Sequence, residues 1–167
     1  STNTTVSLSQ AYGIGSAYSA LLFTEGNKGV TVASSTLVGG ADARGVYVDA
    51  FGGAQNMGLI HIVTNTISGS AIGIEVGNAV SSARVFIASN TIHPAQSVNN
   101  DAEGIYLYDL PGGATVQNNS VFYRTPGSMG GFTSYGVNVM NTPGLVFDHN
   151  RINNPGMITA GSLAGLS

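Results

Sequence analysis

The sequence repeats at intervals of 25 to 31 residues, and this repeat limits the possible folds more than any other feature. Each repeat has a short apolar segment that is followed, four residues after its centre, by a small polar residue. This polar column consists of Ser35, Asn65, Asn90, Asn119 and Asn150. A second segment of each repeat opens with a glycine, and these glycines are Gly45, Gly73, Gly104 and Gly136. Both segments are too short for helices, so ankyrin and tetratricopeptide repeats are excluded.

The alternation of side chains within the segments indicates β-strands. In the segment after Gly45, Val46 and Val48 point to one side while Tyr47 points to the other. Short strands in repeats of this length predict a parallel β-solenoid, in which successive rungs stack about 4.8 Å apart and equivalent positions form columns. The asparagines Asn65, Asn90, Asn119 and Asn150 would then form a ladder, because stacked amides both donate and accept hydrogen bonds.

Two aliphatic columns are expected to point inward and form the core. The first consists of Val32, Ile62, Ile87, Val116 and Phe147. The second consists of Leu37, Ile67, Ile92, Val121 and Ile152.

The Asn-Thr-Ile and Gly-Ile-x-Val segments resemble the right-handed parallel β-helix repeats of the pectin-lyase-like superfamily. The resemblance covers roughly residues 29–157. It implies an all-β chain folded as a right-handed parallel β-helix, a solenoid of about five to six rungs. Proteins with such repeats include polysaccharide lyases and hydrolases, phage tailspikes, surface adhesins and autotransporter passengers, so the fold alone does not determine the function.

The chain therefore divides into three parts. Residues 1–28 are expected to form an N-terminal cap or an incomplete first rung, and residues 158–167 a tail or partial rung after the solenoid. Exposed solenoid ends leave backbone edges unpaired. We expect one or both ends to contact another copy or the rest of a longer parent chain. The alternative is that residues 8–22 form a small cap, with a short helix over residues 17–22.

The composition excludes several classes of protein. The chain has five Lys and Arg against eight Asp and Glu, too few cations for a nucleic-acid-binding surface. It lacks cysteine, which excludes a disulfide scaffold and cysteine-ligated metals. No apolar stretch approaches the roughly 20 residues of a membrane-spanning helix. The chain begins at Ser1 without a leader sequence, which suggests a mature, processed product or a fragment. The few charges, the lack of cysteine and the many Asn, Thr, Ser and Gly residues suit a secreted or cell-surface solenoid.

One column on the outer face suggests a carbohydrate-binding platform. Its members are Tyr47, Glu75, Tyr106 and Asn138, and Glu103 precedes one of the glycines. Aromatic rings stack on sugar faces, while carboxylates and amides bind hydroxyls. The alternative is that tyrosine is simply favoured on sheet surfaces.

Metal ligands and cofactors are poorly represented. Asp101, Glu103 and Asp109 provide oxygens for a candidate Ca²⁺ site, but their spacing matches no calcium-binding motif, and a solvated loop is the alternative. His61, His93 and His149 occupy different positions of the repeat, so we expect surface histidines and no metal site. No other cofactor is indicated.

The motifs that the resemblance would imply for catalysis are absent from the sequence. Hydrolases of the superfamily have neighbouring aspartates, a Gly-His-Gly motif and an Arg-Ile-Lys motif; here no Asp-Asp pair or Gly-His-Gly occurs, and Asn153 follows Arg151 and Ile152. We therefore expect a non-enzymatic role, structural or adhesive, in a fibre, adhesin passenger or appendage that self-associates and contacts glycans. The alternatives are a fragment of a polysaccharide lyase or glycoside hydrolase, with Glu75 and either Glu103 or Asp101 as the candidate acid–base pair, and a phage tailspike segment.

Overall fold

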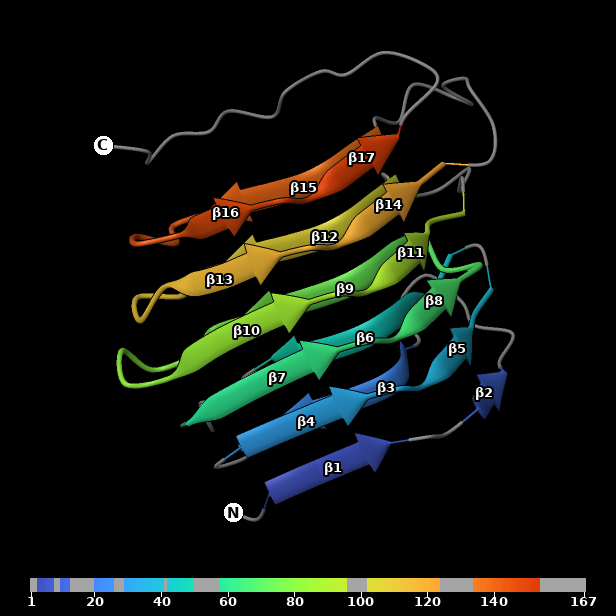
Figure 1. Ribbon diagram of the computed structural model, residues 1–167. Coiled ribbons are helices and arrows are strands. Elements are labelled where there is room, and N and C mark those ends of the chain that lie inside the picture. The colour runs from blue at the N-terminus through green and yellow to red at the C-terminus, as the bar shows by residue number, and fades with distance from the viewer. Residues whose placement is uncertain are drawn as a thin grey trace.

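The computed structural model shows a coil of β-strands (Figure 1). It describes residues 3–7, 10–12, 20–25, 29–40, 42–49, 58–95, 102–123 and 134–153. All regular elements in these ranges are strands, and all the pairings between them are parallel. The expectation of an all-β parallel solenoid is confirmed.

The strands form three sheets. The first contains β1 (Asn3–Ser7), β4 (Gly29–Ala33), β7 (Leu59–Val63), β10 (Arg84–Ala88), β13 (Ala114–Gln117) and β16 (Val146–Asp148). The second contains β2 (Gln10–Tyr12), β5 (Thr36–Val38), β8 (Thr66–Ser68), β11 (Thr91–His93), β14 (Ser120–Phe122) and β17 (Arg151–Asn153). The third contains β3 (Ala20–Glu25), β6 (Arg44–Asp49), β9 (Ile72–Gly77), β12 (Ala102–Tyr108) and β15 (Ser134–Met140).

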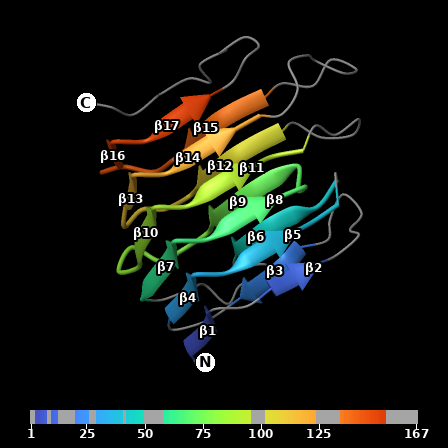
Figure 2. The ribbon, with the colours of Figure 1, turned by 45° about the vertical axis from the view of Figure 1, so that its right-hand side comes forward.

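The chain visits the three sheets in turn, so each coil contributes one strand to each sheet. The five sets from β1–β2–β3 to β13–β14–β15 are complete, and β16 and β17 begin the next coil. Successive coils lie one above the other from the N-terminal strand β1 to β16 and β17 at the opposite end (Figure 2).

The first coil rules out part of the alternative for the N-terminal region, the short helix over residues 17–22. Ala20 and Leu22 belong to β3 and pair with Arg44 and Val46 of β6, so residues 20–22 form a strand and not part of a helix. The apolar run there is compatible with either structure, and pairing with β6 determines which one forms. Residues 17–19, the rest of that alternative helix, and residues 158–167, the expected tail, lie outside the described residues.

The core follows the two predicted aliphatic columns. In the first sheet, Val32, Ile62, Ile87 and Val116 are paired in consecutive register and fully buried. The second-sheet column is equally buried from Leu37 to Val121. Only the last members differ, since Phe147 is 44% and Ile152 37% exposed. Among the described residues no further coil covers these two side chains.

Side-chain amides stabilise the corner between the first and second sheets. The Nδ2 atom of Asn65 donates to Oδ1 of Asn90, and the same contact joins Asn90 to Asn119 and Asn119 to Asn150, at 2.9 to 3.0 Å. Each Nδ2 also donates to a main-chain oxygen of the coil before, as in the bond from Asn90 to Ile62. The predicted asparagine column is therefore one continuous hydrogen-bonded ladder.

The residue before each ladder position has a left-handed backbone conformation. Its φ lies between 49° and 56° at Ser34, Thr64, Ser89, Asn118 and His149. A single left-handed residue turns the chain sharply from the first sheet into the second. Because this residue occupies the equivalent position in each coil, the corners stack above one another.

Candidate functional site

The predicted platform column lies on the outer face of the third sheet. Tyr47 pairs with Glu75, Glu75 with Tyr106, and Tyr106 with Asn138, each on the adjacent strand. Tyr47, Tyr106 and Asn138 are partly exposed. The parallel register thus brings four residues that are distant in sequence into one row.

Glu75 differs from the accessible carboxylate that the platform required. It is only 3% exposed and forms an ion pair with the Arg44 guanidinium. That guanidinium also lies 4.9 Å from the centroid of the Tyr47 ring. Arg44 therefore covers Glu75 and holds it against the sheet. The carboxylate binds Arg44 and is not exposed to solvent.

Asp49 connects two coils at the end of β6. Its carboxylate accepts a hydrogen bond from the Tyr47 hydroxyl at 2.5 Å and another from the Asn78 side-chain amide at 2.7 Å. Asp49 is itself buried. The Tyr47 ring is consequently fixed on both sides, by Arg44 and by Asp49.

Two tyrosines of β12, Tyr106 and Tyr108, form a pair of neighbouring aromatic rings on this face. The centroids of the Tyr106 and Tyr108 rings lie 5.0 Å apart, and the Tyr106 hydroxyl lies 3.3 Å from the Met140 sulfur. Tyr108 covers Gly77 of the adjacent strand, where any Cβ atom would lie 2.1 Å from the ring. Gly77 therefore allows the ring to lie flat on the sheet.

Burial changes the acid–base behaviour of this face. It raises the pKa of Tyr47 to about 12, and the hydrogen bond to Asp49 acts in the same direction. Burial also raises the pKa values of Tyr106 and Tyr108. The pKa of Glu75 is raised by burial, although Arg44 opposes the change. The face thus favours neutral tyrosines.

The structure does not bring the candidate calcium ligands together. Asp101 falls in one of the gaps between the described ranges. Glu103 is buried and accepts a hydrogen bond from Asn138, whereas Asp109 is exposed at the other end of β12 and accepts one from Asn141. The strand separates these two carboxylates by about 20 Å. Across the residues that the structure describes, no group of three His, Asp or Glu side chains could hold a metal ion.

The histidines lie beside aromatic rings or near the end of the coil. His61 contacts the edge of Phe86 and His93 stacks on Phe122, each at 5.6 Å between centroids. His93 is less solvated than expected, since its Nδ1 atom is buried and finds no hydrogen-bond partner among the described residues. His149 is exposed and contacts Asp148 at 2.7 Å.

The described residues also line two open grooves outside the platform column. One, of about 330 Å³, is on the first sheet and includes His61, Arg84 and Phe86. The other, of about 490 Å³, lies where strands of the third sheet end, beside Asn78, Asp109 and Asn141. Sequence reasoning identified neither groove. The sequence placed Arg44 beside the platform column, directly before a column glycine, but did not predict its ion pair with Glu75.

Comparisons with models of protein families, with curated proteins and with solved structures gave no match. In the described ranges, no helix has the length and apolar character needed to span a membrane.

Proposed function

We propose that the chain is an extracellular or cell-surface solenoid with a structural, adhesive role, as a subunit of a fibre, an adhesin passenger or an appendage. The open core at the last described coil carries this proposal. Phe147 and Ile152 occupy inward columns but are exposed, while Val116 and Val121, one coil earlier, are buried. An apolar surface that continues a core favours contact with a further coil.

A second copy of the chain could supply that coil. The strand β1 lies at the opposite end of the first sheet from β16, so among the described strands β1 and β16 are the two edges of this sheet (Figure 1). Contact between two different ends of identical molecules does not close on itself and produces a filament. Only 8% of the residues are charged, which reduces repulsion between copies.

Electron microscopy and light scattering over a concentration series test this proposal. We expect filaments or defined oligomers from the unchanged chain and monomers from Phe147→Lys, because an inward charge on an edge strand blocks pairing. Leu59→Lys is the matched control, since Leu59 is 55% exposed on the side of the coil. A monomeric unchanged chain, or equal loss of assembly in both variants, would contradict the proposal. Circular dichroism verifies that both variants fold.

We further propose that the adhesive contact includes carbohydrate on the third-sheet face. The paired rings of Tyr106 and Tyr108 support this, because such rings stack on the apolar faces of sugars. Tyr106→Ala should abolish retention on immobilised glycans, while Phe122→Ala, on the second sheet, should not. Retention that survives Tyr106→Ala would place the contact elsewhere.

The same preparations distinguish the alternatives. Glycan cleavage that disappears in Glu75→Gln or Glu103→Gln would indicate a fragment of a polysaccharide lyase or hydrolase. A stable trimer without filaments would indicate a tailspike segment.

A further inference from the structure

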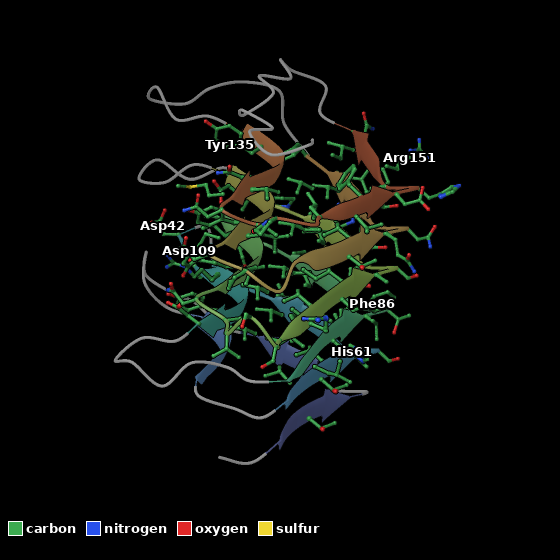
Figure 3. All side chains as sticks on the ribbon, turned by 90° about the vertical axis from the view of Figure 1, so that its left-hand side faces the viewer. Asp42, His61, Phe86, Asp109, Tyr135 and Arg151 are labelled. Atoms are coloured by element: carbon green, nitrogen blue, oxygen red, sulfur yellow. The ribbon has the colours of Figure 1, made fainter. Side chains whose placement is uncertain are left out.

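The groove on the first sheet is lined by a cation, aromatic rings and a hydroxyl, which are typical of a binding site. The proposed function assigns no role to this groove. Three of its residues share one outward row, because His61 pairs with Phe86 and Phe86 with Thr115. Figure 3 shows His61 and Phe86 side by side on this face. Arg84, the turn of Gly112 and Gly113, and Gly144 complete one end of the groove.

Main-chain oxygens hold the Arg84 guanidinium in place. Its Nη1 atom donates to the carbonyl oxygens of Ala83 and Ser81 at 2.9 and 3.1 Å and lies 3.5 Å from that of Gly112. Gly112 permits this arrangement, because a Cβ atom there would lie 2.2 Å from the Ala83 oxygen. A guanidinium fixed before binding loses little conformational entropy when a ligand arrives.

The remaining donors of Arg84 are available to a ligand. A guanidinium has five N–H groups, and every hydrogen bond that Arg84 makes within the described residues uses Nη1. The edge formed by Nε and Nη2 matches the two oxygens of a carboxylate or sulfate.

The charge around the groove also favours an anion. Arg84 is the only charged residue in β4, β7, β10 and β13, and none of the described residues forms an ion pair with it. The chain as a whole has a net charge of −3, so a cation without a counter-ion among the described residues is unusual in this chain.

We propose that this groove binds a carboxylate or sulfate group carried on a ring. Arg84 holds the anionic group through its Nε and Nη2 edge. The Phe86 ring and the His61 edge contact the ring of the ligand, and the Thr115 hydroxyl donates a hydrogen bond to it. The proposal is independent of filament formation and of the third-sheet face.

Saturation-transfer NMR on the full chain tests the proposal, because the method detects weak ligands of both monomers and assemblies. The probes are benzoate, cyclohexanecarboxylate and phenyl sulfate, with benzamide as the neutral analogue. We expect transfer to the anionic probes and at least about tenfold weaker binding of benzamide. Preference between benzoate and phenyl sulfate identifies the anion, and cyclohexanecarboxylate shows whether the ring must be aromatic.

Two variants and a matched control locate the site. Arg84→Gln should weaken benzoate binding by at least about tenfold. Arg151→Gln should leave it unchanged, since Arg151 also lies near an aromatic ring, Phe122, but on another sheet. If Arg84→Gln misfolds, Thr115→Tyr fills the groove without changing charge and should also abolish binding. No transfer to any anionic probe, equal binding of benzamide and benzoate, or unchanged binding in the folded variants would overturn the proposal.

Discussion

The glycines near the start of β6, β9, β12 and β15 are required by side chains of the second sheet. At Gly45, Gly73 and Gly104 the main-chain oxygen of the glycine in the next coil also leaves no room for a Cβ atom. A Cβ atom on Gly73 would lie 2.3 Å from Cγ2 of Ile92, and one on Gly104 would lie 2.5 Å from Cγ1 of Val121. The repeated Gly-Ile-x-Val pattern therefore reflects packing between two columns. Strand propensity alone would disfavour glycine at these positions.

Gly73→Ala should lower the free energy of unfolding by about 1 to 3 kcal/mol, because the added methyl group overpacks the core. Urea titration followed by circular dichroism measures this change. The double variant with Ile92→Leu removes the Cγ2 branch and should recover part of the loss. An unchanged free energy of unfolding in Gly73→Ala would show that the glycine column and the Ile92 column can move apart without cost.

A second residue-scale prediction concerns the asparagine ladder. Asn90→Ala removes the acceptor of the Asn65 main-chain N–H and the donor to the Ile62 oxygen. Two buried polar groups lose their partners, so the unfolding free energy should fall by about 2 kcal/mol or more. Asn153→Ala, at an exposed position outside the ladder, should change it by less than about 0.5 kcal/mol. Similar values for the two variants would mean that the amide ladder contributes little.

At the scale of the strands, the third sheet shows which features of its outer face can be predicted from the sequence and which cannot. Strand periodicity and the repeat length predict the row from Tyr47 to Asn138, because parallel register is fixed by the columns. Periodicity does not predict that Arg44 reaches across to Glu75, nor that Tyr108 lies over Gly77. These contacts depend on side-chain rotamers that differ from coil to coil.

The tyrosines of this face should make the fold sensitive to alkali. The pKa of Tyr47 is raised from its ordinary value of 10 to about 12, chiefly by burial, so the unfolded chain loses this proton more readily. Stability from this group is therefore complete below pH 10 and is lost as the pH rises through 12. Thermal unfolding between pH 8 and 12 should show a falling melting temperature, together with tyrosinate absorbance on unfolding.

Tyr47→Phe is the matched variant for this pH dependence. It removes the titrating hydroxyl, so the loss of stability above pH 10 should become less steep. An unchanged slope would assign the alkaline sensitivity to other tyrosines, such as Tyr108, whose pKa is also raised by burial.

For the whole molecule, the repeat predicts the architecture. The features that the sequence did not predict lie where the repeat is weakest. The short polar column and the glycine column were sufficient to predict stacked parallel strands. The segment around Leu22 lacks both signals, and an apolar run without them does not distinguish a strand from a helix. The separation of Glu103 from Asp109 likewise depends on where β12 begins and ends, which the repeat does not specify.

A coil in which each turn contacts only its neighbours should be least stable at its ends. Hydrogen exchange on dilute chain should show slow amides in β7 and β10 and fast amides in β16 and β17, where the core is exposed. If the open end joins copies into filaments, raising the concentration should slow exchange in β16 and β17 and leave β7 unchanged. The Phe147→Lys variant should lack this concentration dependence. Assembly that protects amides elsewhere and leaves β16 fast would place the contact on a side of the coil.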